Sequence, residues 1–332
     1  MIANVSIGLA DSKAHLAAFL AGKHNIALIT DGAAYSLCGA EKFFTDFLSD
    51  YPTLSITHLI VPSANPKVET VQPLLDSLPA NIEAFIAVGG GTTIDTPKLL
   101  NLAVSTKKNI KSILELGLNL QPSTFNLQPC LAFPTTAGTG AEATRFAVCY
   151  DGEVKYSIDF EVIKPTDVAL IPDFTATLPP YQRASTNFDA YAQAVESLWA
   201  NGATDESRAF AQKALDLISS ASSDLDLLLA SYYAGCAIDI SRTTAAHAFS
   251  YYLTSHYGIP HGAAVYMVFE YICKNNGHPE YIRKVDRLQT LREFADEKGL
   301  AWDALIDDLF AHVNLKRLGN NPCPVLKESF KN

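Results

Sequence analysis

The sequence lacks the features of a membrane-spanning or disulfide-stabilised protein. It has no uninterrupted apolar run of about 18 residues, the length that a transmembrane helix needs. Its N-terminus shows no basic stretch followed by a long apolar segment. The six cysteines are widely spaced and form no Cys-x-x-Cys pair, which favours neither a disulfide framework nor a thiolate zinc site. We therefore expect a reduced, cytoplasmic protein.

Positive charge is also scarce. The 25 lysines and arginines are outnumbered by 35 aspartates and glutamates, which gives a formal net charge of -10 at pH 7. Such a surface repels nucleic-acid phosphates and anionic lipids, so we expect a small-molecule substrate rather than nucleic acid or a membrane. Hydrophobic residues make up 48% of the chain and charged residues 18%, as in globular enzymes. The 332 residues suffice for two domains.

Short apolar runs alternate with amphipathic stretches in the first half of the chain. This pattern is typical of strands joined by crossover helices in a parallel sheet. We predict strands at residues 26–29, 59–61, 85–88 and 130–133. The turns that follow them are Asp31-Gly32, Pro62-Ser63, Gly89-Gly90-Gly91 and Pro134-Thr135-Thr136. An α/β sheet binds ligands beyond the carboxyl ends of its strands, so these turns should share one rim.

The second half of the chain has a different pattern. An extended portion over residues 146–171 contains Asp151-Gly152, a hairpin-turn dipeptide. Helical periodicity dominates after residue 173, as at residues 204–218, 225–240 and 281–298. We therefore predict an α/β dinucleotide-binding domain over residues 1–173 and an all-α domain over residues 174–332, packed around one cleft.

Two loops carry the chemistry expected of a nucleotide site. Strand residues lead into Gly89-Gly90-Gly91-Thr92, and a helix is predicted to begin near Ile94 with Asp95 in its first turn. The backbone amides of such a loop and the helix dipole favour a pyrophosphate, although a plain tight turn explains the glycines equally well. The loop 134–142 brings Thr135, Thr136 and Thr139 to the same rim, or else forms a threonine-rich helix cap.

A set of metal-binding side chains lies in the helical half. Asp189 and Gln193 are four residues apart, so both face the same side of a helix, and His247 and His261 follow later. A carboxylate with imidazoles suits Fe²⁺ or Zn²⁺. Each histidine taken alone is more often a core or surface residue than a ligand, and spacing does not join them into one site.

Four motifs, at residues 89–98, 134–142, 189–196 and 247–262, together resemble the iron-containing alcohol dehydrogenase family. The resemblance implies a dehydroquinate synthase-like fold, with an N-terminal nucleotide-binding α/β domain and a C-terminal helical domain that holds a catalytic Fe²⁺ or Zn²⁺. It implies that Asp189, His247 and His261 are ligands. Gln193 stands where the family usually has another histidine, and its neutral carbonyl oxygen is a weaker ligand than imidazole. Tyr251 stands where many members have a histidine, so proton delivery falls to water, the cofactor ribose or Tyr251.

Within the family the segment 241–262 is most similar to the hydroxyethylphosphonate dehydrogenases, or phosphonoacetaldehyde reductases. A phosphonate dianion needs charged and hydroxyl donors. The substrate-site candidates are Arg145, Arg242, Thr243, Thr244 and Ser250, and Lys155 is a candidate for the substrate or the cofactor. A solvated surface charge or an ion pair between domains explains each cation equally well.

The resemblance implies that nicotinamide delivers hydride to an aldehyde whose oxygen is polarised by the metal. Asp31 ends a strand where a carboxylate would accept the adenosine ribose hydroxyls, which favours NADH over NADPH, unless it forms only an Asp-Gly turn. A homodimer is compatible with this reading. Two alternatives stay open: a dehydroquinate synthase-like lyase that regenerates its NAD in each turnover, and a non-catalytic binding protein derived from this fold.

Overall fold

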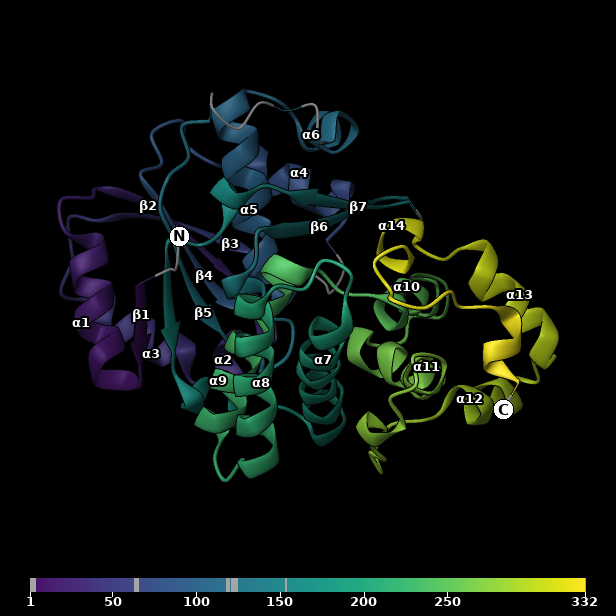
Figure 1. The fold of residues 1–332 in the computed structure, drawn as a ribbon. Helices are drawn as coiled ribbons and strands as arrows, with labels where there is room; N and C mark the ends of the chain where they lie inside the picture. The colour runs from purple at the N-terminus through teal and green to yellow at the C-terminus, as the bar shows by residue number, and fades with distance from the viewer. Residues whose placement is uncertain (1–3, 63–65, 118–119, 121–124, 153, 332) are drawn as a thin grey trace. The chain divides into compact units, whose positions relative to one another are not determined.

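The computed structural model describes residues 4–62, 66–117, 120, 125–152 and 154–331. The chain divides into two compact units (Figure 1). The sheet unit comprises Met1–Thr136 and Ala141–Thr177, and the helical unit comprises Ala137–Gly140 and Leu178–Asn332. The division into functional domains at residues 1–173 and 174–332 stays a prediction. The two compact units differ from this division mainly in the loop 137–140, which packs within the helical unit.

A six-stranded sheet forms the centre of the sheet unit. Its order is β1-β8-β5-β4-β2-β3, and every neighbouring pair is parallel. The strands are β1 (Asn4–Ile7), β2 (Asn25–Thr30), β3 (Ser55–Ile60), β4 (Ala84–Gly89), β5 (Cys130–Pro134) and β8 (Asp167–Leu170). Three predicted strands are confirmed as β2, β4 and β5. The strand predicted at 59–61 begins four residues earlier, as β3, and ends at Ile60, and the short strand β1 was not predicted. The fold class, a parallel α/β domain followed by a helical domain, is confirmed.

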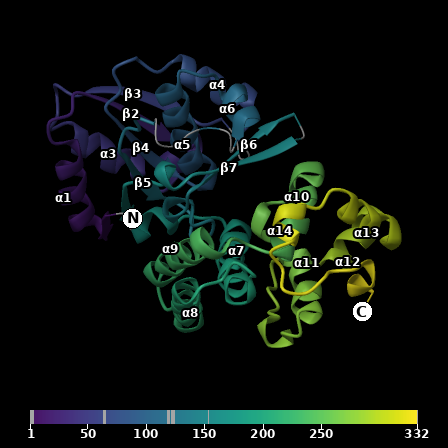
Figure 2. The same ribbon diagram turned by 45° about the horizontal axis from the view of Figure 1, so that its top comes forward.

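Helices cover both faces of this sheet (Figures 1 and 2). Ile26 and Leu28 of β2 pack in one core with the helices α1 (Leu9–Leu20) and α3 (Ala40–Leu48). Ala27 and Ile29 point the other way, into a core with α4 (Val68–Asp76), α5 (Gly91–Thr106) and α6 (Ile110–Leu116). Side chains alternate across a strand, so two covered faces require the continuous apolar runs seen in the sequence. The short helix α2 (Gly32–Leu37) follows β2 directly.

A separate antiparallel hairpin follows β5. It joins β6 (Phe146–Asp151) to β7 (Val154–Asp159), with Asp151 opposite Val154. Gly152 in its turn has a φ of 59°, the left-handed region that glycine adopts without strain. The predicted hairpin turn at Asp151-Gly152 is confirmed.

Among the described residues, the helical unit contains eight α-helices. They are α7 (Pro180–Trp199), α8 (Asp205–Ser220), α9 (Asp224–Ser241), α10 (Ala245–Tyr257), α11 (His261–Asn275), α12 (Leu291–Lys298), α13 (Trp302–Ala311) and α14 (Leu315–Leu318). The helices predicted at 204–218 and 225–240 are confirmed. The helix predicted at 281–298 is wrong in its first half, because Thr290 caps α12: its hydroxyl accepts from the Glu293 amide, and the Glu293 carboxylate accepts from the Thr290 amide.

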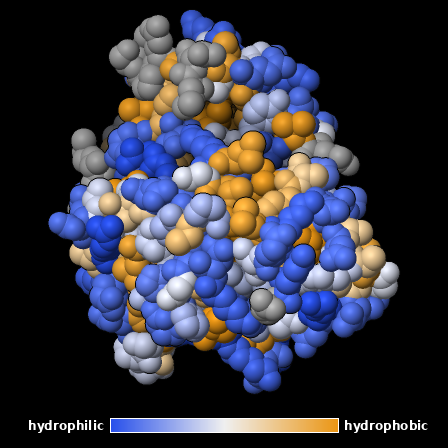
Figure 3. Space-filling model, turned by 45° about the vertical axis from the view of Figure 1, so that its right-hand side comes forward, coloured by the Kyte–Doolittle hydropathy of each residue, from blue (hydrophilic) through white to orange (hydrophobic). Residues whose placement is uncertain are grey.

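None of the helices within the described residues is long and apolar enough to cross a membrane. Hydrophilic residues cover much of the face drawn in Figure 3, with hydrophobic ones gathered in smaller groups.

Lys98 is a fully buried cation in the middle of α5. Its Nζ donates to Asp95 Oδ1 at 3.0 Å and to the carbonyl oxygens of Ala141 at 2.8 Å and Phe146 at 2.7 Å. The other Asp95 oxygen accepts from the Val148 amide at 3.1 Å. The Asp95–Lys98 pair therefore ties α5 to Ala141 and to the first strand of the hairpin, β6.

We predict that Lys98→Met destabilises the protein by about 3–5 kcal/mol, because it leaves the buried Asp95 carboxylate without its cation. Urea denaturation followed by circular dichroism measures this loss. The double variant Asp95→Asn, Lys98→Met should recover part of the stability, since it removes the uncompensated charge. A Lys98→Met protein as stable as the wild type would contradict this role.

Candidate metal centre

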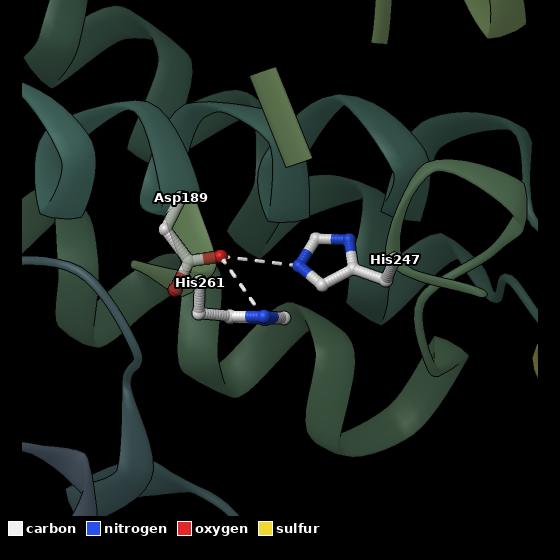
Figure 4. Close-up of side chains that lie close together, drawn as sticks. All are labelled: Asp189, His247 and His261. Atoms are coloured by element: carbon white, nitrogen blue, oxygen red, sulfur yellow. Dashed lines mark hydrogen bonds and ion pairs between the residues drawn. The ribbon is translucent and has the colours of Figure 1, made fainter. Parts of the chain in front are cut away.

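Three side chains of the helical unit converge on one point. Asp189 lies in the middle of α7, His247 in the first turn of α10, and His261 is the first residue of α11. The Nε2 atom of His247 is 3.1 Å from Asp189 Oδ1, and the Nε2 atom of His261 is 3.8 Å from the same oxygen (Figure 4). One candidate ligand atom from each residue lies within 4.8 Å of the others. His247 and His261 follow Asp189 by 58 and 72 positions in the sequence, yet all three side chains meet in the structure.

The three side chains differ in their exposure. Those of Asp189 and His247 are 2% and 4% exposed, whereas that of His261 is 31% exposed. The constellation is therefore closed on the side of α7 and α10 and accessible at His261. Catalytic metal sites have this character, with a set of protein ligands and one position left for substrate or water.

Glu196, on the same helix as Asp189, holds the opposite edge of the His247 ring. His247 Nδ1 lies 2.5 Å from Glu196 Oε2, and the carboxylate also accepts from the Thr244 hydroxyl and the Ala246 amide, both at 2.8 Å. Burial alone would lower the pKa of His247, but the charge of Glu196 and the hydrogen bonds to Asp189 and Glu196 outweigh it and raise that pKa to about 10. Burial acts to raise the pKa of Glu196, yet the charge and hydrogen bond of His247 lower it.

Glu196 is not among the site residues expected from the sequence. Positions 189, 193 and 196 follow the i, i+4, i+7 spacing of one helix face, and this signal was available in the sequence. Three polar residues on a buried helix face are costly unless they bond to one another or to a ligand.

Gln193 lies one turn after Asp189. Its Nε2 donates to the carbonyl oxygen of Thr139 at 3.3 Å, and its Oε1 is buried without a hydrogen-bond partner among the residues described. A buried amide oxygen without a partner is rare in folded proteins. The carboxylate of Asp189 and the imidazoles of His247 and His261 form a donor set that suits Fe²⁺ or Zn²⁺. The residues present therefore fit a divalent transition metal.

Glycines allow the close backbone packing around this site. A Cβ atom on Gly262, next to His261, would lie 1.9 Å from the Ser185 carbonyl oxygen and 3.1 Å from Asp189 Cβ. A Cβ atom on Gly138 would lie 2.6 Å from the Thr186 carbonyl oxygen, and one on Gly140 would lie 2.5 Å from Gly235 Cα. The loop 137–140 thus packs closely against α7 and α9, which explains why it belongs to the helical unit.

The sheet unit contains most of the predicted nucleotide-binding residues. Gly89 ends β4, Gly90 caps α5, and α5 begins at Gly91. The expected start near Ile94 is therefore wrong, and Asp95 lies beyond the first turn, where it pairs with Lys98. The early start leaves the amides of Gly91 and Thr92 in the first turn, where helices bind anions.

Asp31 follows β2 at the point where the sheet order reverses, with β3 on one side of β2 and β4 on the other. Its Oδ2 accepts from the Gly90 amide at 3.3 Å, and its buried Oδ1 finds no partner in the described part of the chain. Burial raises the pKa of this carboxyl to about 6 against the lowering effect of the Gly90 amide.

The Thr135 amide bonds to the Gly89 carbonyl at 3.1 Å, and Thr136 lies beside Gly90. The turns after β2, β4 and β5 therefore share one rim; Ser63, from the predicted fourth turn, lies outside the described residues.

The other candidates interact with groups of the protein itself. Thr244 and Ser250 are fully buried and donate to Glu196 and to the His247 carbonyl. The Arg242 guanidinium donates to the Asp239 and Ile240 carbonyls of its own helix. Thr243 is also buried, Arg145 pairs with Glu161, and Lys155 lies over the Tyr150 ring. The Tyr251 ring does approach one candidate metal ligand, with its centroid 6.2 Å from that of the His261 ring.

We predict that Gly262→Ala weakens Zn²⁺ binding at least about tenfold, because the added methyl group pushes α11 away from α7 and moves His261. Competition with a chromophoric chelator measures the affinity. Gly299→Ala is the matched control: it introduces a similar methyl group at a φ of 63° with no heavy atom within 4 Å, so it should leave metal binding unchanged. Equal Zn²⁺ affinity of the Gly262→Ala protein and the wild type would contradict this packing argument.

Both parts of the chain match a known protein family. Residues 8–172 match the iron-containing alcohol dehydrogenase family, and residues 183–319 match the C-terminal part of the Fe-containing alcohol dehydrogenase family. The NAD-dependent methanol dehydrogenase of Bacillus methanolicus is 28% identical over 256 residues, which cover 73% of this chain and 65% of that protein. The phosphonoacetaldehyde reductase of Streptomyces viridochromogenes is 31% identical over 198 residues, which cover 55% and 50%. The chain thus spans between half and two thirds of these curated relatives.

The fold has solved counterparts. The crystal structure of sulfoacetaldehyde reductase from Bifidobacterium kashiwanohense in complex with NAD⁺ superimposes with a TM-score of 0.83 at 24% identity, covering 98% of this chain and 94% of that one. At this identity the likeness shows the fold alone. The sequence matches to both parts of the family show that the chain belongs to the iron-containing alcohol dehydrogenase family.

Proposed function

We propose that this protein is a metal-dependent alcohol dehydrogenase that uses NAD(H) to interconvert a small aldehyde and its alcohol. The observation that carries the proposal is the convergence of Asp189, His247 and His261 on one partly accessible point. A divalent cation bound there would supply a Lewis acid for the carbonyl oxygen. The ligand set would be completed by the unpartnered Oε1 of Gln193.

The residues at the carboxyl rim of the sheet would bind the cofactor. The first-turn amides of α5, from Gly91 and Thr92, would hold the pyrophosphate, and Thr135 and Thr136 would line the same rim. The unpartnered Oδ1 of Asp31 would accept a ribose hydroxyl and would repel a 2′-phosphate. These features support NADH over NADPH.

Two candidate groups could deliver the proton that the reduction of an aldehyde to an alcohol requires. Water reaches the partly exposed His261, and the Tyr251 phenol lies beside the same imidazole. Tyr251 is therefore our candidate for proton delivery from the protein.

Phosphonoacetaldehyde is the specific substrate that we propose to test first. It is supported by the similarity of the segment 241–262 to phosphonoacetaldehyde reductases and by the Streptomyces relative. Its reduction should be compared with that of uncharged aldehydes of similar size, in protein loaded with Fe²⁺ or Zn²⁺. Net consumption of NADH with an aldehyde supports the dehydrogenase. A lyase that regenerates its cofactor would show no net change in NADH absorbance.

We predict that His261→Ala lowers turnover at least about 100-fold while the protein stays folded, because it removes a metal ligand at the accessible edge of the site. Steady-state NADH oxidation and circular dichroism measure the two effects. His256→Ala, which removes an exposed histidine from α10, is the control and should retain activity. Full activity of the His261→Ala protein in metal-free buffer would refute the proposed function.

We also predict that NADH binds more weakly as the pH falls below about 6, since the Asp31 carboxyl then takes up a proton and loses its charge-assisted bond to ribose. Fluorescence titration of NADH between pH 5 and pH 8 gives the dissociation constant. Asp31→Asn should bind NADH weakly with a flat profile over this range. The same pH dependence in both proteins would assign the effect to another group.

A further inference from the structure

We infer that Glu196 is a positioning residue that fixes the metal-facing tautomer of His247. The inference rests on the proposed metal site and adds a residue outside its ligand set. Glu196 is fully buried on α7, and its Oε2 lies 2.5 Å from His247 Nδ1. The carboxylate accepts the Nδ1 proton, so the lone pair of a neutral His247 ring lies on Nε2, the atom 3.1 Å from Asp189.

The two oxygens of Glu196 have separate tasks. Oε1 accepts from the Thr244 hydroxyl and the Ala246 amide, and Oε2 faces His247. The direction of the Thr244 bond is fixed, because the Thr244 hydroxyl also accepts from Trp199 Nε1 at 3.1 Å. The Thr244 proton must therefore point at Glu196.

The same carboxylate anchors the start of α10. Thr244 is the N-cap of this helix and uses no side-chain bond to cap it, while Ala246 supplies one of the first-turn amides. Glu196 thus replaces a local cap and fixes the helix start and the His247 ring to α7. A negative charge at a helix N-terminus is also favoured by the helix dipole.

This division of tasks makes Glu196→Gln a sharp test. The amide oxygen must take the Oε1 position, where the Thr244 and Ala246 protons point. The amide NH₂ group is then placed against His247 Nδ1, and it demands an acceptor there. The ring proton moves to Nε2, which removes the lone pair that would bind the metal.

We expect Glu196→Gln to weaken Zn²⁺ and Co²⁺ binding about 10- to 100-fold in chelator competition. Glu142→Gln is the matched control, because Glu142 is a second fully buried glutamate, in the sheet unit and outside the metal site. It should leave both affinities unchanged. Thr244→Val removes one bond to Glu196 but keeps the bond to His247, so it should lower thermal stability more than metal affinity.

Long-range ¹H–¹⁵N NMR of the Zn²⁺-loaded wild type tests the tautomer without any variant. It should show a proton on His247 Nδ1. A proton absent from Nδ1, or a Glu196→Gln protein that binds metal as tightly as the wild type, would overturn the inference alone. Equal losses of metal affinity in Thr244→Val and Glu196→Gln would also overturn it, in favour of a purely structural role. A wild type that binds neither Zn²⁺ nor Co²⁺ would overturn the proposed function and this inference with it.

Discussion

The site depends on the need to compensate two carboxylates buried on one helix. Asp189 and Glu196 lie two turns apart on α7 and are 2% and 0% exposed, and an isolated buried charge is strongly destabilising. His247 lies between them and bonds to both. The imidazolium form supplies one positive charge, and a divalent cation with a neutral His247 would supply two. The arrangement of α7, α10 and α11 is thus a way of holding negative charge in the core with a cation between the helices.

Close backbone packing makes this arrangement possible. Gly262 lets α11 approach Ser185, and Gly138 and Gly140 let the loop 137–140 lie against α7 and α9. The same loop contributes the Thr139 carbonyl that accepts from Gln193, so a segment that looked like part of a nucleotide cradle bonds to the helix that carries Asp189. Its neighbours Thr135 and Thr136 belong to the sheet unit and stay candidates for cofactor binding.

The periodicity of apolar residues in the sequence predicts much of the fold. The apolar runs of β2 to β5 predict a parallel sheet covered by helices. The dipeptide Asp151-Gly152 predicts the turn of the separate hairpin β6–β7. The convergence of Asp189, His247 and His261 could not be derived from spacing, because it depends on the packing of three helices; it was expected only from family resemblance. Periodicity also failed at residues 281–290, where the cap formed by Thr290 delays the helix.

Polar residues were harder to assign. Asp95, Thr244 and Ser250 looked available to ligands in the sequence, yet their bonds are internal. Glu196 went unassigned, although its carboxylate bonds directly to the His247 ring. A sequence shows which polar residues share a helix face, but only the packed structure shows whether their partner is the protein, a metal or a ligand.

Anomalous X-ray diffraction from crystals grown with Zn²⁺ tests the central claim most directly. The account predicts one strong peak about 2.0–2.2 Å from Asp189 Oδ1, His247 Nε2 and His261 Nε2. No peak at that point in crystals that hold zinc elsewhere would contradict it.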